Sequence, residues 1–352
     1  CPPLVIAEIG INHDGNFERA KQMVKDACEN GAECVKFQCH IIDDEMIPND
    51  VIPPNATESI WNMMKRCSFS EEQEIELKKY TEELGMIYLN TPFSRAAADR
   101  LDKMDVCAYK IGSGECNNFP LISHIASFSK PVILSTGMND MDSISKSVDI
   151  LKKAKIDYAI MHVTSMYPTP YDKVRLNVIT KLKEKFPDAV IGLSDHSFGN
   201  YTCFAAISLG ASILEKHFTS DKNWSGPDIP ISITPEELKD LVRGSKAIFD
   251  SLNGKKSILD GEKETAKFAY ASVVTISDIE KGEHFSTDNI WVKRPGTGDF
   301  LAKDYNKLLG KQANKKIISG EYIKKKYLNL KKIKKLKKTK KKKITNQNIK
   351  HE

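Results

Sequence analysis

Several patterns that mark common protein classes are absent from this 352-residue sequence. No apolar run approaches the ~18 residues that suggest a membrane span, and no signal-peptide pattern is present. There is no GxGxxG after the first predicted strand, no P-loop, no HExxH helix and no GxSxG elbow. These absences argue against a membrane protein, a Rossmann dehydrogenase, a zinc protease and an acyl-transfer hydrolase. Because the chain starts at Cys1, almost on that strand, part of its natural N-terminus is expected to be missing.

Cysteine is present but never in a CxxC pair, which excludes zinc-ribbon and thioredoxin-like sites. Several cysteines lie in apolar, strand-like runs, as buried reduced thiols do. This usage predicts a reducing, cytoplasmic compartment. The eight positions are 1, 28, 34, 39, 67, 107, 116 and 203.

The net charge of +6 comes from one end of the chain. Residues 324–343 contain 13 lysines and no acid, and without them 40 basic residues face 47 acidic ones, a balance of −7. The acidic body argues against a groove for nucleic acid. The lysine-rich end is low in complexity and is predicted to be a disordered tail. Binding of this tail to an anionic membrane or to nucleic acid is the alternative.

Short β-like runs alternate with helical patterns along the first 250 residues. The last helical pattern begins with Pro235 after Thr234, a favourable first-turn and N-cap pair. Eight such units in this length predict an α/β fold, a closed (β/α)8 TIM barrel. An open doubly wound sheet is the alternative, but its glycine fingerprint is absent. The predicted strands are 4–10, 33–40, 86–93, 107–114, 131–138, 158–165, 189–197 and 212–219.

The pattern changes after the barrel. We expect a catalytic barrel over 1–250, an extended linker over 251–270, a small strand-rich domain over 271–328 and the tail over 329–352. A proline-containing insertion at 43–64 separates the second and third strands. It is expected to form a long loop on the active face, in the manner of a lid.

Polar residues gather where the predicted strands end, which is where TIM barrels carry their active sites. Barrel interiors are normally filled by Val, Ile and Leu, so this polarity is unusual. Two lysines, several hydroxyls and a Gly-Ser-Gly turn suggest that phosphate and carboxylate groups bind here. In chain order the residues are Glu8, Asn12 and His13; Lys36 and Gln38; Asn90 and Thr91; Lys110, Ser113 and Glu115; Ser135 and Thr136; His162, Thr164, Ser165 and Tyr167; Ser194 and His196; Glu215 and His217.

Some of these residues have a second interpretation. Lys36 and Lys110 could form structural ion pairs with Glu8 and Glu115, and the serines could be turn residues. His196 and His217 end neighbouring strands, which lie about 4.8 Å apart. Their imidazoles could share one divalent metal, with substrate oxygens and water as the other ligands. A hydrogen-bonded histidine pair without a metal is the alternative.

The polar segments also resemble a known family. EIGINHDG, VKFQ, NTPFS, YKIGSGECNN, LSTGM, MHVTSMYPTPY, GLSDHS, LEKHFT, FAYASVV and VKRPGTGDF occur in order between residues 4 and 328. They closely resemble bacterial N-acetylneuraminate (sialic acid) synthases, a family that also contains legionaminate and pseudaminate synthases. The resemblance implies a TIM barrel followed by an antifreeze-like (SAF, β-clip type) domain. It also implies a domain-swapped homodimer in which each small domain covers the partner's barrel mouth.

The resemblance further implies a reaction and its residues. Phosphoenolpyruvate would condense with N-acetylmannosamine, and phosphate would leave by C–O cleavage. A divalent ion is implied, most often Mn²⁺, with Mg²⁺ or Co²⁺ as alternatives, and its ligands would be His196 and His217. Phosphoenolpyruvate contacts would fall on Lys36, Thr91, Lys110, Ser113, Ser135 and Ser194. Sugar contacts would fall on Glu8, Gln38, Tyr167 and Asp228, with Arg294 reaching in from the partner subunit.

Three positions need separate mention. Ser165 stands where some bacterial members have asparagine, and it can still donate a hydrogen bond. Glu115 is our candidate for handling the proton of the attacking water, and Glu8 is our candidate for positioning the sugar.

Two other functions of the protein stay open at this point. One is a related synthase that uses a different hexosamine, such as the legionaminate precursor, and the other is a non-catalytic sugar- or ice-binding protein.

Overall fold

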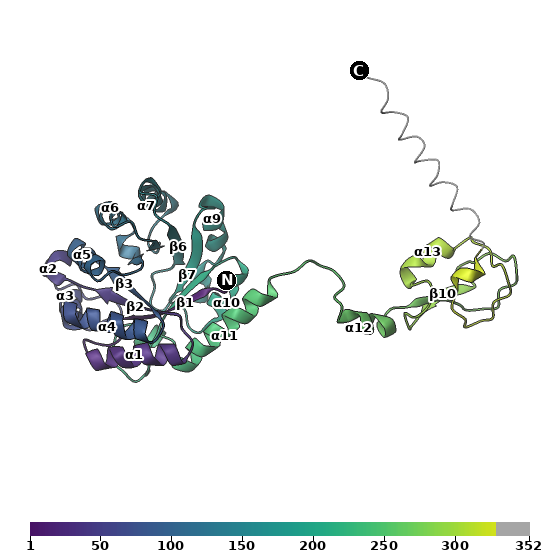
Figure 1. Ribbon diagram of the computed structural model, residues 1–352, viewed down its shortest axis with the longest axis horizontal. Helices are drawn as coiled ribbons and strands as arrows, with labels where there is room; N and C mark the ends of the chain where they lie inside the picture. The colour runs from purple at the N-terminus through teal and green to yellow at the C-terminus, as the bar shows by residue number, and fades with distance from the viewer. Residues whose placement is uncertain (329–352) are drawn as a thin grey trace, which may run out of the picture. The chain divides into compact units, whose positions relative to one another are not determined.

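Eight parallel strands close into a barrel, as the alternating pattern predicts (Figure 1). The computed structural model describes residues 1–328, in one unit of Cys1–Asn253 and a second that starts at Gly254. The TIM-barrel prediction is therefore confirmed. The strands are β1 (Leu4–Gly10), β2 (Cys34–Cys39), β3 (Ile87–Pro92), β4 (Tyr109–Ile111), β5 (Val132–Ser135), β6 (Tyr158–Val163), β7 (Val190–Asp195) and β8 (Ile213–His217).

Helices surround the strands and bury one apolar face against them (Figure 1). The last of them shows why the sequence folds this way: Thr234 accepts from the backbone N–H of Glu237, and the Glu237 carboxylate accepts from that of Thr234. This capping box fixes where the helix starts. No helix within residues 1–328 is long and apolar enough to cross a membrane. The main helices are α1 (Phe17–Glu29), α4 (Glu71–Glu83), α5 (Arg95–Lys103), α6 (Phe119–Ala126), α7 (Met141–Lys153), α9 (Asn177–Lys185), α10 (Tyr201–Ser208) and α11 (Pro235–Ser251).

The interior of the barrel changes character along its strands. An apolar cluster occupies the part nearest the strand starts, and its buried members are Ile6, Cys34, Leu89, Ala159, Met161, Val163 and Ile213. Packing there is tight: a Cβ on Gly192 would collide with the Met161 sulfur and lie 2.7 Å from the Ile213 carbonyl oxygen. Side chains alternate between the two faces of a strand. The interior position after Ile6 is therefore Glu8, and the one after Ile213 is Glu215.

The insertion at 43–64 is only partly a loop. Helix α2 (Ile42–Glu45) overlaps its start, and helix α3 (Ile60–Cys67) begins inside it. Ser59 starts α3 by accepting a hydrogen bond from the backbone N–H of Asn62. The helix then buries Met63 and Met64 beside Ile11. The expectation of an entirely irregular segment was wrong, because a capping serine and an apolar face stabilise a helix.

The second unit has its own core. Strands β9 (Ser272–Thr275) and β10 (Ile290–Lys293) pair antiparallel, and the short helix α13 (Tyr305–Leu308) follows. Its buried residues include Val273, Phe285, Ile290 and Ile317. The expected linker at 251–270 is not extended throughout, because helix α12 (Glu262–Ala269) occupies its second half. Glu, Lys and Ala in this stretch favour helix. The expected disorder of 329–352 concerns residues outside those described.

One buried histidine gives a testable stability effect. The His13 ring stacks on Phe69 with centroids 4.2 Å apart, and its Nδ1 accepts from the backbone N–H of Gly15 at 3.1 Å. Burial lowers the pKa of His13 to about 3. Because an unfolded histidine titrates near 6.5, the unfolded state binds a proton that the folded state does not. Stability is therefore lost as the pH falls below about 6.5.

We expect the free energy of unfolding of the wild type to fall faster with acid than that of His13→Phe. The difference in slope should approach ~1.4 kcal/mol per pH unit between pH 6 and pH 4. Urea unfolding of both proteins at several pH values measures it. Equal slopes would show that His13 is not the acid-sensitive group.

Candidate active site

A cavity of about 950 Å³ lies at the carboxyl ends of the barrel strands. It brings together the residues to which the sequence analysis gave a catalytic, substrate-binding or metal-binding role, with one exception. The exception is Arg294, which is exposed in the second unit. The residues that line the cavity are Glu8, Lys36, Gln38, Thr91, Lys110, Ser113, Glu115, Ser135, Ser165, Tyr167, Ser194, His196, His217 and Asp228.

Other polar residues expected at the strand ends do not line the cavity. Their side chains bond elsewhere: Asn12 donates to the Phe218 carbonyl, Thr136 to the Met161 carbonyl and Asn90 to the Tyr88 hydroxyl. The side-chain alternation of a strand explains Asn90, since its neighbour Thr91 faces inward. The residues of this group are Asn12, His13, Asn90, Thr136, His162 and Thr164.

Four buried charges form the floor of the cavity. Lys36 Nζ lies 2.6 Å from Glu8 Oε2 and 3.8 Å from Glu215 Oε1. Lys110 Nζ donates to both oxygens of Glu215, each at 3.0 Å. Ser194 Oγ also donates to Glu215, at 2.9 Å. The two ammonium groups therefore balance the two carboxylates, which is what allows four charges to be buried together.

The pairing of Lys110 corrects one expectation. Its partner is Glu215, directly across the barrel interior, and not Glu115. Glu115 lies past the end of β4 in a short 3₁₀ helix, Ser113–Glu115, where it accepts from the Asn118 side chain at 2.5 Å. Glu115 is therefore on the cavity wall without a lysine partner among the described residues.

The electrostatics of the floor follow from burial and pairing. Burial acts to raise the pKa of Glu215, but Lys110 and Lys36 outweigh it and hold that pKa at about 2. Burial lowers the pKa of Lys110, and Glu215 opposes this. Burial, aided by the charge of Glu8, raises the pKa of Asp228 to about 7.

The hydroxyl groups of Ser113, Ser135 and Ser165 line the cavity. Gly137 N–H donates to Ser113 Oγ at 3.0 Å. A Cβ on Gly137 would collide with the Ser165 hydroxyl and lie 2.8 Å from Ser113 Oγ, so only glycine fits there. The Ser165 hydroxyl is buried and has no protein partner in the described chain. An unpaired hydroxyl donor in the same cavity as two lysines suits an anionic ligand.

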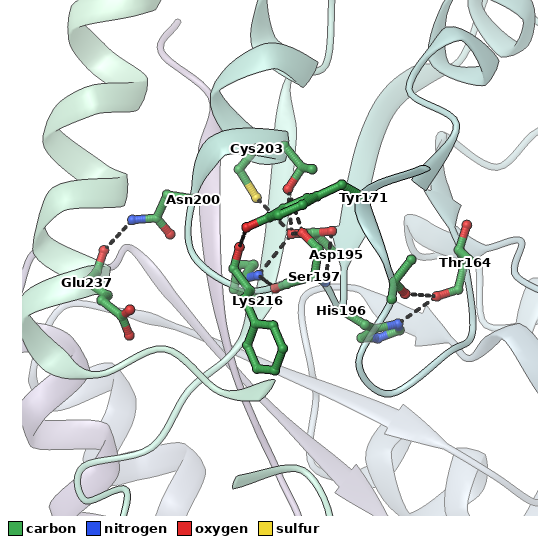
Figure 2. A network of polar contacts seen from close by, with 12 residues as sticks. Thr164, Tyr171, Asp195, His196, Ser197, Asn200, Cys203, Lys216 and Glu237 are labelled. Atoms are coloured by element: carbon green, nitrogen blue, oxygen red, sulfur yellow. Dashed lines mark hydrogen bonds and ion pairs between the residues drawn. The ribbon is translucent and has the colours of Figure 1, made fainter. Parts of the chain in front are cut away.

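The two predicted histidines lie side by side. The ring centroids of His196 and His217 are 5.4 Å apart, and Tyr167 packs 4.2 Å from His196. Nδ1–H of His196 donates to the Thr164 carbonyl at 3.0 Å (Figure 2), which leaves the lone pair on Nε2. His217 Nδ1 is buried without a hydrogen-bond partner among residues 1–328, and it lies 3.8 Å from Asp228 Oδ2.

This histidine pair fits a divalent metal ion. Burial lowers the pKa of His196 and, well below its usual range, that of His217. Neutral imidazole is the form that binds metal, and the unpaired ring nitrogen of His217 could offer its lone pair to a metal ion. No group of three or more His, Cys, Asp and Glu in the described part of the chain could hold a metal. An ion here would therefore have two imidazole ligands and need further ligands from substrate and water.

Sequence reasoning missed a polar chain on the cavity wall. The His40 ring lies between Glu45 Oε2, 2.7 Å from Nδ1, and Gln38 Oε1, 3.0 Å from Nε2. It also stacks on Phe93, with centroids 4.7 Å apart. Gln38 Nε2 then donates to Glu8 Oε1 at 3.3 Å. A signal existed: His40 follows Gln38 by two residues and so points to the same face.

The second feature that was missed is apolar. Met46, Ile60, Met63 and Met64 from the insertion face the cavity together with Ile11. These side chains pack on one another as a separate cluster. The cavity thus has a charged floor and one apolar wall. Sequence reasoning placed the insertion on the active face, but could not show which of its residues point inward.

Comparisons with known proteins agree with this geometry. The model of the NeuB family matches residues 23–257, and that of the SAF domain matches residues 270–328. The N,N'-diacetyllegionaminic acid synthase of Campylobacter jejuni is 34% identical over 331 residues, which cover 91% of this chain and 98% of that protein. Human N-acetylneuraminate-9-phosphate synthase is 33% identical over 317 residues, 88% of each chain.

A solved structure is also similar. The N-acetylneuraminic acid (sialic acid) synthetase of Leptospira borgpetersenii, in complex with citrate, superposes with a TM-score of 0.70 at 31% identity. The match covers 75% of this chain and 90% of that one. These relatives have different names for their products, so they agree on a class of reaction and differ in the sugar.

Proposed function

This chain belongs to the NeuB family and is a phosphoenolpyruvate-dependent nonulosonate synthase, a transferase; on that premise we propose that its sugar substrate is N-acetylmannosamine. The products would be N-acetylneuraminate and phosphate. The observation that supports the synthase chemistry is the cavity itself, where two buried lysines and two neutral imidazoles meet one group of hydroxyl donors. A non-catalytic sugar- or ice-binding protein would not need this set. The choice of N-acetylmannosamine rests on the resemblance of the sequence motifs to N-acetylneuraminate synthases.

The lysines bind the enol phosphate in this proposal. Lys36 and Lys110 are paired with carboxylates at the floor. An incoming phosphate and carboxylate would share these ammonium groups, because charge-assisted hydrogen bonds to anions are strong in a buried site. Ser113 and Ser135 would add hydroxyl donors on one side. Thr91 and Ser194 would do the same on the side of Lys36 and Glu215.

His196 and His217 are the proposed metal ligands. A divalent ion there, which we propose to be Mn²⁺, would supply Lewis-acid polarisation of the open-chain sugar aldehyde. Thr164 would keep His196 in the tautomer that leaves Nε2 free. Glu8 and Gln38, hydrogen-bonded to each other, would orient the sugar hydroxyls beside the ring pair. Tyr167 and Asp228 would bound the sugar on the other side.

The proposed reaction also needs a group that accepts a proton from the attacking water. The C=C π electrons of phosphoenolpyruvate form a bond from carbon 3 to the aldehyde carbon, which leaves positive charge at carbon 2. The C=O π bond of the aldehyde breaks, and its oxygen takes up a proton to become a hydroxyl group. Water adds at carbon 2, and the tetrahedral adduct loses phosphate with cleavage of its C–O bond. Glu115 is the proposed acceptor of the water proton, since it lines the cavity and forms no ion pair with a lysine of residues 1–328. A positioned carboxylate of this kind contributes typically ~10²–10⁴-fold.

A second sugar has an observation in its favour. The apolar wall of Met46, Ile60, Met63 and Met64 could receive methyl groups. A 2,4-diacetamido-trideoxy hexose, which leads to legionaminate, offers more methyl groups than N-acetylmannosamine. Incubation of the protein with phosphoenolpyruvate and each sugar, followed by mass analysis, separates the two. A product from the diacetamido sugar alone would overturn the N-acetylmannosamine proposal.

We also propose that the site is completed by a partner. Arg294 follows β10 and is exposed. In a domain-swapped homodimer it would reach the partner's barrel mouth and bind the N-acetyl carbonyl of the sugar.

We propose a cytoplasmic location as well, which is supported by eight cysteines that are all unpaired in the described chain.

Arg294→Ala tests this arrangement. We expect the KM for the sugar to rise by ~10- to 100-fold, as loss of a charged hydrogen bond of about 1.5–3 kcal/mol predicts. The KM for phosphoenolpyruvate should change much less, because its proposed contacts all belong to the barrel. Lys293→Ala, which removes the exposed cation next to Arg294 in the chain, is the matched control. Equal changes in both KM values for Arg294→Ala would contradict the assignment.

A further inference from the structure

A buried ion pair lies just outside the cavity, next to the two proposed metal ligands. Lys216 Nζ is 2.9 Å from Asp195 Oδ2, and the two side chains are 0% and 1% exposed. The residues are direct partners in the pairing of β7 with β8. Neither lines the cavity. The pair therefore contacts no substrate, and its burial needs another explanation.

The position of the pair in the sequence suggests that explanation. Asp195 precedes His196, and Lys216 precedes His217. Since successive side chains of a strand point to opposite faces, the histidines face the cavity and the ion pair faces the helix layer. Each half of the pair is thus joined through one peptide unit to one imidazole. Because Asp195 and Lys216 are paired across β7 and β8, their ion pair holds the backbone at the ends of the two strands, where His196 and His217 are attached.

Further bonds extend this restraint to the loop after His196 (Figure 2). The Asp195 carboxylate also accepts from Ser197 Oγ at 2.8 Å and from Thr202 Oγ1 at 2.7 Å. Lys216 Nζ donates in addition to the Ser197 carbonyl. His196 is therefore held on both sides along the chain, and β8 is tied to the same loop.

The restraint matters most for His217. His196 has its own orienting bond to the Thr164 carbonyl, but the Nδ1 of His217 has no hydrogen-bond partner among the described residues. The position of the His217 ring thus depends on the position of its backbone, which the ion pair of Lys216 with Asp195 restrains. We propose that Asp195 and Lys216 are positioning residues that set the spacing of the two imidazoles and thereby the affinity for the divalent ion. This inference rests on the proposed metal-binding role of the histidines.

Direct measurement of Mn²⁺ binding tests the proposal. The metal-free full-length chain is titrated with Mn²⁺ and free ion is followed by electron paramagnetic resonance, with no substrate present. We expect Asp195→Asn and Lys216→Met each to raise the Kd by about 10- to 100-fold, the usual cost of losing a group that orients metal ligands. Activity lost at low Mn²⁺ should return at high Mn²⁺.

A matched control separates positioning from stability. Glu74 is a buried carboxylate, 2% exposed, that pairs at 3.1 Å with the partly exposed Arg100, and it neither lines the cavity nor adjoins a proposed ligand. Glu74→Gln should lower the melting temperature and leave the Kd for Mn²⁺ unchanged. If a single variant fails to fold, the double variant Asp195→Asn with Lys216→Met leaves no unpaired charge and is the one to titrate.

The outcomes are distinguishable. A folded double variant that binds Mn²⁺ as tightly as the wild type would overturn the positioning role while leaving the histidine ligands intact. A wild type that does not bind Mn²⁺ would overturn the ligand assignment, and this inference with it. Weak binding by the Asp195 and Lys216 variants, with normal binding by Glu74→Gln, would support both.

Discussion

Replacement of His196 with alanine is expected to lower metal-dependent turnover by about three orders of magnitude. The physical reason is that polarisation of a carbonyl by a bound ion supplies several kcal/mol, and each 1.4 kcal/mol corresponds to a factor of ten in rate. The fold should survive, because the ring faces the cavity and its one hydrogen bond goes to the Thr164 carbonyl. Phosphate release at increasing Mn²⁺ concentration measures the effect.

His124→Ala is the control for this experiment. His124 lies on α6, pairs with Asp99 at 2.7 Å and does not line the cavity. Its loss should leave the Mn²⁺ dependence of turnover unchanged. If His196→Ala kept near-normal activity without added metal, the ligand assignment would be wrong, and the ring pair would be a structural contact instead.

Replacement of Glu215 with glutamine should destabilise the barrel and at the same time expose its anion site. Glu215 balances Lys110 and part of the charge of Lys36. Breaking a buried ion pair from one side typically costs ~3–5 kcal/mol, a large part of the ~5–15 kcal/mol that stabilises a domain. Urea unfolding should therefore show a much lower free energy of unfolding for Glu215→Gln than for the wild type.

The same variant should respond to anions. Phosphoenolpyruvate or phosphate would supply the negative charge that the variant lacks, so either should raise its melting temperature more than that of the wild type. The double variant Glu215→Met with Lys110→Met removes both charges, should regain most of the lost stability, and should lose the protection by phosphoenolpyruvate. Equal protection of all three proteins would show that these lysines do not bind the anion.

The barrel and most of its cavity could be predicted because two regular features of parallel strands act together. Alternation along each strand points every second residue inward, and parallel strands place their carboxyl ends together. Lys36 with Gln38, Ser194 with His196, and Glu215 with His217 each follow this spacing, and all six line the cavity. The resemblance to a family then added Asp228, which lies outside the strands in the chain segment after β8.

The rest depends on contacts that no local pattern contains. The choice of Glu215 over Glu115 as partner of Lys110 is made across the barrel, by strands more than 100 residues apart in sequence. The pairing of His40 with Glu45 depends on the direction that helix α2 takes after β2, because Glu45 is the last residue of that helix. Helix α12 was taken as a linker because its polar sequence has no buried face to reveal it.

The apolar packing at the strand starts has a kinetic consequence. Met161 and Ile213 fill the space beside Gly192, so the apolar cluster closes this part of the barrel interior below the cavity that contains Lys110. Lys110 is 2% exposed, whereas Tyr167 at the rim is 40% exposed. If phosphoenolpyruvate contacts the deep ammonium groups, as proposed, we expect it to bind before a sugar that occupies the rim, because a sugar already bound there would block its path.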